Sequence, residues 1–161
     1  MNHEEAEAWR KREIAATNYR SKLRDARERK GLAKHEAAQL ISTIVGSDSN
    51  YYDIEEHDRS FTYSYSLDEI TKVCEKLGIH PRDLFCDKKY AAILISEVAE
   101  RIKTHCVEKK ISIGEFEDIA GWKLESCLSN STNALDDWDI DCLIDVSREL
   151  QIDWQCVITG L

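Results

Sequence analysis

Apolar residues recur along this chain at intervals of three and four, the spacing that places them on one face of an α-helix. The clearest case is Leu67–Leu77, where an apolar face alternates with charged positions. Gly78 follows at the position where helices commonly end, and His80-Pro81 cannot continue a helix. The pattern therefore predicts one well-defined amphipathic helix here.

The first half contains two more helix-length segments and a third, shorter one. The spacing predicts helices over Tyr19–Lys30, which Gly31 ends, and over Leu32–Thr43. Gly46–Asp58 predicts a short helix that begins at a polar cap, with Tyr52 and Ile54 facing the core. On this register, the residues that face outward are Ser49, Asn50 and Tyr51.

Three other segments connect or extend these helices. Residues 1–18 predict a helical extension that packs on the first domain through Trp9; a dimer contact and a DNA-binding arm are the alternatives. Phe61–Ser66 is polar and aromatic and predicts a loop or a short extended segment. Tyr90–Lys110 has apolar residues at helical spacing and predicts one long helix.

The second half repeats the pattern of the first. Ile140–Ile158 aligns with Leu67–Phe85 without a gap, and apolar positions coincide along the whole run. Lys109–Ser112 likewise matches Lys30–Ala33. We therefore expect an all-α fold of two tandem small helical bundles. The predicted parts are an N-terminal helical extension over 1–18, a first domain over 19–88, and a second, degenerate and acidic domain over 89–161.

Charge is distributed unevenly between these parts. The chain has 161 residues and a formal net charge of −9. Acidic and basic residues nearly balance over residues 19–86, 12 against 11, whereas residues 87–161 have 15 acidic and 8 basic side chains. Because affinity for phosphates comes from Lys and Arg, any DNA-binding surface should belong to the first half.

The remaining chemistry argues against an enzyme, a metal site or a membrane protein. The six cysteines include no CxxC pair and are interpreted as small buried apolar residues, and the histidines lack ligand spacing. No phosphate loop, nucleophile motif or paired acids are present, so we expect no catalytic residue and no cofactor. The charged N-terminus and the lack of a long apolar run favour a cytoplasmic protein.

The segments LRDARERKGLAKHEAAQLI, YYDIEEHD and SLDEITKVCEKLGIHPRDLF, taken together, resemble the Cro/phage-repressor type of helix-turn-helix, the XRE family. The resemblance covers Tyr19–Cys86, about two-fifths of the chain. It implies a DNA-binding domain in which Gly46–Asp58 contains the recognition helix. Glu55 matches an acidic residue that serves the fold in that family.

The resemblance also implies which side chains would contact DNA. Ser49, Asn50 and Tyr51 would reach the bases in the major groove. Phosphate contacts would come from Arg20, Lys22, Arg24 and Lys34. The basic residues of the first helix have a second interpretation, as partners of Asp25 and Glu28 on a solvated face. The predicted recognition helix departs from the family because it has no Arg or Lys before Arg59.

Two functions remain open at this point. The first is a sequence-specific DNA-binding transcriptional regulator in which the acidic second domain mediates homodimer formation or partner binding. The second is an acidic antitoxin or immunity protein that keeps the repressor fold, has lost DNA binding and binds a basic protein. We assign no DNA contact to the second domain, whose Gly121–Asn133 stretch contains Lys123 as its one cation.

Overall fold

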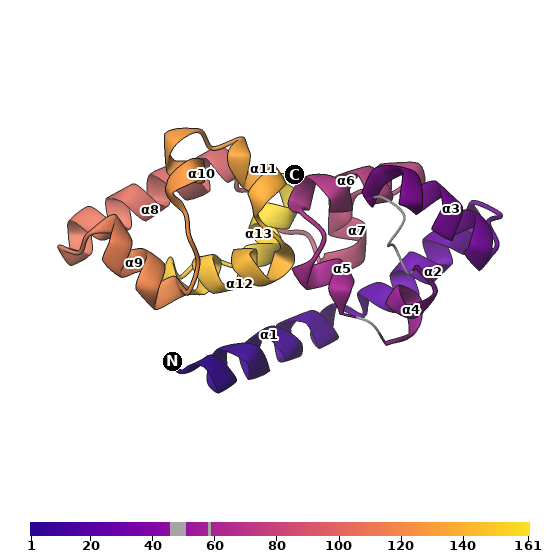
Figure 1. The fold of residues 1–161 in the computed structure, drawn as a ribbon, viewed down its shortest axis with the longest axis horizontal. Helices are drawn as coiled ribbons and strands as arrows, with labels where there is room; N and C mark the ends of the chain where they lie inside the picture. Colours follow the sequence, from indigo (N-terminus) through magenta and orange to yellow (C-terminus); the bar gives the residue numbers. More distant parts are fainter. Residues whose placement is uncertain (46–50, 58) are drawn as a thin grey trace.

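A computed structural model describes residues 1–45, 51–57 and 59–161, and in these ranges every regular element is an α-helix (Figure 1). The expectation of an all-α fold is therefore confirmed. The helices are α1 (His3–Thr17), α2 (Tyr19–Arg29), α3 (Lys34–Val45), α4 (Tyr51–Glu56), α5 (Ser60–Tyr63), α6 (Leu67–Lys76), α7 (Pro81–Phe85), α8 (Ile95–Lys109), α9 (Ile113–Ala120), α10 (Glu125–Ser129), α11 (Asn133–Asp137), α12 (Ile140–Glu149) and α13 (Trp154–Thr159). None of these described helices is long and apolar enough to cross a membrane.

Two of the predicted segments differ from the structure. Phe61–Ser66 was expected to be a loop or extended, but it contains most of α5, whose Phe61 ring stacks on Tyr19 with centroids 5.7 Å apart. The long helix expected over Tyr90–Lys110 begins only at Ile95. The residues before it are not helical: Leu94 has an extended backbone, and the Ile93 N–H bonds to the Cys156 carbonyl at 3.0 Å.

The helices form two sets of six, α2–α7 and α8–α13, that lie side by side (Figure 1). In this view a half-turn in the plane of the picture brings each helix of one set onto its counterpart in the other. Thus α3 and α9 lie at opposite corners, as do α4 and α10, while α7 and α13 meet at the centre. The arrangement approximates a two-fold axis along the line of sight.

Contacts between the two sets follow this symmetry. Helix α5 packs against α12, α6 packs against α11, and α7 packs against α13. Such reciprocal pairs are what a two-fold interface produces, because each surface meets the surface equivalent to its partner. At the centre the rings of Phe85 and Trp154 lie edge to face, 6.0 Å apart. The Leu67 N–H also bonds across the interface to the Trp138 carbonyl at 2.8 Å.

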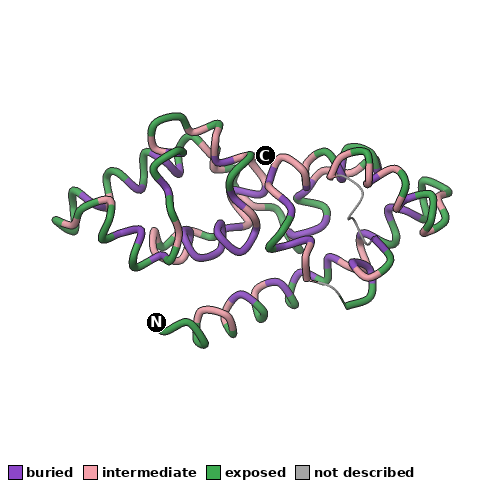
Figure 2. Tube along the Cα trace, viewed as in Figure 1, coloured by how far each residue is buried: buried purple, intermediate pink, exposed green. Residues whose placement is uncertain are grey.

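The interface is part of one continuous apolar core. Buried backbone is concentrated where α12 and α13 meet the first set (Figure 2). Eight consecutive residues of α12, Ile140 to Ser147, are buried, so this helix is surrounded on all sides. A helix enclosed in this way cannot present a polar face to solvent. Its acidic residues must therefore find partners inside the protein.

The ends of equivalent helices are built alike. Helix α2 ends at Gly31 with φ of 74°, and α8 ends at Lys110 with φ of 55°. After α6, Gly78 has φ of 74°, and Gln151 has φ of 57° at the same place after α12. A left-handed residue at this position satisfies the last carbonyls of a helix. At these two pairs of positions, only the first set has glycine. Lys110 and Gln151 of the second set therefore adopt the left-handed conformation at the energetic cost that a side chain imposes.

Helix α1 has no counterpart in the second set. It lies across the lower side of the molecule in Figure 1 and contacts α12 of the second set and α7 of the first. The predicted N-terminal helix is thus confirmed, and it bridges both sets instead of packing on the first alone. Its Glu13 accepts a hydrogen bond from the Trp154 indole at 3.1 Å.

Candidate nucleic-acid interface

The predicted recognition helix has a different register from the one expected. Tyr51 was expected to face outward as a DNA contact, but it is 1% exposed, whereas Tyr52, expected in the core, is 43% exposed. The Tyr51 hydroxyl donates to Glu55 Oε1 at 2.7 Å. The prediction for Tyr51 is therefore wrong: its hydroxyl completes a buried polar cluster and its ring fills the core.

Glu55 is the centre of that cluster. Arg27 Nε donates to Glu55 Oε1 at 2.6 Å, and Arg27 Nη2 donates to Oε2 at 3.2 Å. The hydrogen bond and the charge of Glu55 raise the pKa of Arg27, although burial opposes this rise. Burial, followed by the hydrogen bond to Glu55, raises the pKa of Tyr51 far above its ordinary value. This cluster joins α2 to α4. The Arg27 guanidinium is therefore already bound within the protein.

The other two residues predicted to read bases lie in the segment 46–50. Ser49 and Asn50 therefore fall outside the described residues. Their role stays a prediction.

The four predicted phosphate-contacting residues occupy different environments. The Arg20 guanidinium lies over the Tyr19 ring, 5.1 Å from its centroid, and Lys34 Nζ donates to Glu56 at 2.8 Å. Arg24 is exposed and makes one long hydrogen bond, 3.4 Å, to Ser21. Lys22 is partly buried.

These cations do not form one patch. The pKa of Glu56 is lowered chiefly by its hydrogen bond with Lys34 and further by the charge of Arg24, so these two cations lie beside α4. Lys22 instead lies near Cys86, where its charge opposes the rise in thiol pKa that burial causes. The two sides of α2 thus carry separate positive charges.

In the second set, two short helices are joined by a tight turn. Helix α9 ends at Gly121, which has φ of 81°, and α10 begins at Glu125 after a short turn. Two hydrogen bonds, one at Trp122 and one at Leu124, hold this turn in place. The Leu124 N–H bonds to the buried Glu117 carboxylate at 2.6 Å, and the Trp122 indole donates to Asp145 at 2.8 Å. Lys123 remains exposed at its centre.

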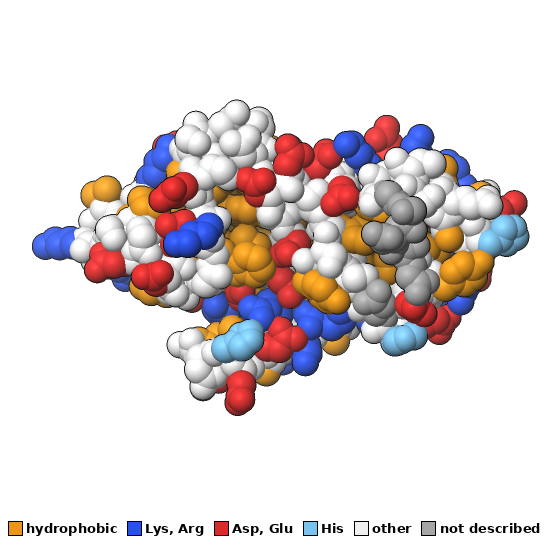
Figure 3. Space-filling model, in the orientation of Figure 1, with side chains coloured by type: hydrophobic (Ala, Val, Ile, Leu, Met, Phe, Trp, Pro, Cys, Tyr) orange, Lys and Arg blue, Asp and Glu red, His pale blue; other side chains and the backbone are white. Residues whose placement is uncertain are grey.

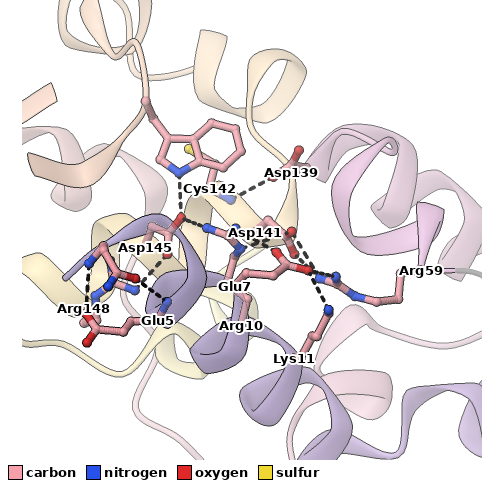
Figure 4. Close-up of polar contacts among 12 residues, drawn as sticks. Glu5, Glu7, Arg10, Lys11, Arg59, Asp139, Asp141, Cys142, Asp145 and Arg148 are labelled. Atoms are coloured by element: carbon pink, nitrogen blue, oxygen red, sulfur yellow. Dashed lines mark hydrogen bonds and ion pairs between the residues drawn. The ribbon is translucent and has the colours of Figure 1, made fainter. Parts of the chain in front are cut away.

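An ion-pair network, buried on the α12 side, joins α1 and Arg59, the residue before α5, to α12 (Figure 4). Arg10 Nη1 donates to Asp145 Oδ2 at 2.7 Å, and Arg10 Nε lies 3.5 Å from Asp141. Arg59 Nη1 donates to Glu7 at 2.6 Å, and its Nη2 lies 3.3 Å from Asp141. Figure 3 shows Lys and Arg side chains gathered in this region, between α1 and the rest of the molecule.

The pKa values of three acids in this region are shifted, two of them upward by burial. Burial raises the pKa of Asp141 to about 6, against the lowering effect of Arg59 and Arg10. Burial likewise raises the pKa of Asp139, which caps α12 by accepting from the Cys142 N–H at 2.8 Å, to about 6. Glu7 is more accessible, and its hydrogen bond with Arg10 lowers its pKa to about 2. Asp141 and the neighbouring cap Asp139 are therefore protonated as the pH falls through about 6, whereas Glu7 stays ionised.

This network was not predicted from the sequence. One signal was available: Asp141 and Asp145 stand four residues apart within an otherwise apolar run, so both lie on one face of a buried helix. Their partner Arg10 lies 135 residues from Asp145 in sequence, and no local pattern predicts that pairing.

Within the described ranges, no group of three or more His, Cys, Asp or Glu residues could hold a metal ion. A cavity of about 440 Å³ lies between the start of α1 and the α9–α10 turn, lined in part by His3, Ile119 and Trp122. Its two arginines, Arg10 and Arg148, both bind Asp145, so neither guanidinium is free for an anion in the cavity.

No family model, curated protein or solved structure matches this chain. Its function must therefore be inferred from its own residues and their arrangement.

Proposed function

We propose that the protein is a sequence-specific DNA-binding transcriptional regulator. In this proposal each set of six helices is a repressor-type helix-turn-helix module, and the chain is the single-chain equivalent of a two-fold dimer. The second domain then serves as the partner of the first. A separate homodimer is not required, because the surfaces that would pair two modules already meet within one chain.

One observation carries the proposal, the reciprocal packing of α5 on α12, α6 on α11 and α7 on α13. Helix-turn-helix proteins bind DNA as two-fold dimers because the two strands of a duplex are themselves related by two-fold axes. A chain that builds this symmetry internally has a reason to do so if its ligand has the same symmetry. The matched helix ends after α2 and α8, and after α6 and α12, further support a repeated module.

Fewer residues of the first module are proposed to contact DNA than the sequence predicted. Lys22 and Arg24 remain the best candidates for phosphate contact. Arg20 is stacked on Tyr19, and Lys34 lies between two acids, the buried Glu55 and Glu56. Base reading is assigned to Ser49 and Asn50 by the resemblance, without Tyr51.

The proposal is tested by selecting binding sites from a pool of random DNA duplexes with the full chain. Fluorescence anisotropy then compares the selected duplex with a shuffled one at low and at physiological salt. We expect tight binding to the selected duplex that survives physiological salt. Binding that ignores sequence, or that disappears with salt, would overturn the proposal.

Asn50→Ala tests the base-reading assignment separately. Loss of discrimination between selected and shuffled duplexes, with unchanged thermal stability, is the expected result. Unchanged discrimination would remove Asn50 from the interface.

A second function is favoured by the charge of the molecule. The net charge is −9, and three cations around α2–α5 are already paired, Arg27 with Glu55, Lys34 with Glu56 and Arg59 with Glu7. An acidic antitoxin or immunity protein that covers a basic partner would have this surface. A stoichiometric complex with the product of an adjacent gene, combined with no binding to any duplex at low salt, would favour this function.

A further inference from the structure

Two of the four proposed phosphate-contacting cations have counterparts in the second set of helices. The match of Lys30–Ala33 with Lys109–Ser112 extends back along α2 and α8 without a gap. Lys22 then corresponds to Arg101, and Arg24 corresponds to Lys103. Arg20 and Lys34 correspond to Ala99 and Ile113. The two cations with counterparts, Lys22 and Arg24, are therefore the same two that remain candidates for phosphate contact in the first module.

The burial pattern supports this alignment. Tyr19 and Leu23 of α2 are buried, and so are Val98 and Ile102 at the equivalent positions of α8. The two helices thus present the same face to their own cores. Residues that match in sequence must then project from their modules in the same direction.

The surroundings of the cations also correspond. Arg24 lies beside α4, where its charge lowers the pKa of Glu56 after the larger effect of Lys34. Lys103 lies beside α10, where its charge opposes the rise in the pKa of Cys127 that burial causes. On the other side of each helix, Lys22 lies near Cys86 and Arg101 lies near Cys156.

Both second-set cations are accessible to a ligand. Arg101 and Lys103 are exposed. Lys103 forms an ion pair with Glu100 at 3.0 Å, and both side chains of this pair are largely in solvent, 46% and 73% exposed. An exposed pair of this kind contributes little, so Lys103 is free to exchange Glu100 for a phosphate.

We infer that the second module also binds DNA, through contacts of Arg101 and Lys103 with phosphates. This inference rests on the proposed function and reverses the expectation that the acidic half makes no DNA contact. The approximate two-fold axis relates these cations to Lys22 and Arg24, so the two pairs would contact equivalent phosphates on opposite strands. The acidic module then fixes register and orientation, while sequence is read mainly by the first module.

The test measures how the affinity for the selected duplex depends on salt, for three double variants with the same change in charge. These are R101Q/K103Q, K22Q/R24Q and the control K72Q/K76Q. The control positions lie on α6, and their counterparts in α12 are the acidic residues Asp145 and Glu149. A two-fold phosphate contact is therefore not possible through them.

Each phosphate contact contributes about 0.9 to the slope of log affinity against log salt. We expect R101Q/K103Q and K22Q/R24Q to reduce the slope by the same amount, about one to two, because the two cations of each pair lie on opposite sides of their helix. K72Q/K76Q should leave the slope unchanged. Hydroxyl-radical footprinting should show two protected sets of phosphates about one helical turn apart, and R101Q/K103Q should lose one set.

A normal slope and footprint in R101Q/K103Q, together with a reduced slope in K22Q/R24Q, would overturn the inference and leave the proposed function intact. A slope that falls equally in K72Q/K76Q would also overturn it, because the effect would then follow net charge alone. If the unaltered chain binds no duplex at low salt, the proposed function itself fails. Melting curves of all variants verify that each is folded.

Discussion

Replacing Arg10 with Met should be among the most destabilising single changes in this protein. Arg10 is 9% exposed, and its guanidinium is 2.7 Å from Asp145, which is 1% exposed. Met keeps the apolar stem of the side chain and removes its charge. The substitution therefore removes the charge that pairs with Asp145 and Asp141 of α12, together with the weaker, more exposed pair with Glu7.

The magnitude follows from what Asp145 retains. Removing one partner of a buried ion pair costs about 3–5 kcal/mol, because the remaining charge stays buried. Asp145 still accepts hydrogen bonds from Arg148 and from the Trp122 indole, both at 2.8 Å. We therefore expect the lower end, about 3 kcal/mol. For a chain of this length, that corresponds to a fall in Tm of about 6–12 °C.

Thermal and urea unfolding, followed by circular dichroism, measure this effect. Arg12→Met is the matched control, because Arg12 is exposed on the same helix and lies over the face of Trp9, 4.8 Å from the ring centroid. This change should cost about 1 kcal/mol or less. The double variant R10M/D145N should lose less than the sum of the single changes. Two outcomes would refute a stabilising Arg10–Asp145 pair. One is equal stability of R10M and R12M, and the other is a loss in R10M/D145N that equals the sum of the losses in R10M and D145N.

Three further predictions concern protonation, the corrected register and backbone approach. Asp139 has a pKa raised to about 6 by burial, so its contribution to stability is complete below its unfolded pKa and is lost as pH rises through 6. Asp139→Asn keeps a capping side chain, so unfolding measured from pH 4 to 7 should show a smaller loss of stability. Tyr51→Phe should cost about 1 kcal/mol through its lost hydrogen bond, whereas Tyr52→Phe should be neutral in urea unfolding. Gly160→Ala should destabilise by about 1–3 kcal/mol, because a Cβ there would overlap a backbone carbonyl, whereas Gly114→Ala in α9 should stabilise by about 0.5–1 kcal/mol.

Each of these predictions has a contrary outcome. An Asp139→Asn variant with the pH profile of the unaltered protein would show that burial does not shift this carboxyl. Equal effects of the two tyrosine changes would contradict the buried position of Tyr51. A Gly160→Ala variant as stable as Gly114→Ala would mean that the chain end does not approach the segment before α8.

Local structure was largely predictable from the sequence. The amphipathic helix expected over Leu67–Leu77 is α6, and the one expected over Tyr19–Lys30 is α2. Both rest on residues within one or two helical turns of each other, together with a cap or a glycine at the end. Such interactions act over short stretches of chain, so a periodic pattern describes them well.

The register of α4 shows where the pattern stops being informative. Tyr51 and Tyr52 are adjacent and chemically identical, so hydrophobicity cannot decide which of them is buried. The choice depends on Glu55, whose carboxylate accepts hydrogen bonds from Tyr51 and from Arg27 of another helix. A contact between helices thus determines which tyrosine is buried, because helix propensity and hydrophobicity are the same for Tyr51 and Tyr52.

The sequence by itself determined the helical class and most helix positions. Only the tertiary structure decided how the two sets of helices meet. Pairing of α5 with α12 and α6 with α11, and the Arg10–Asp145 bond across the whole chain, join segments that are remote in sequence. Periodicity records which face of a helix is apolar, but many partners could cover that face. The partner is selected by shape and charge complementarity over the entire core, which exists only once the chain is folded.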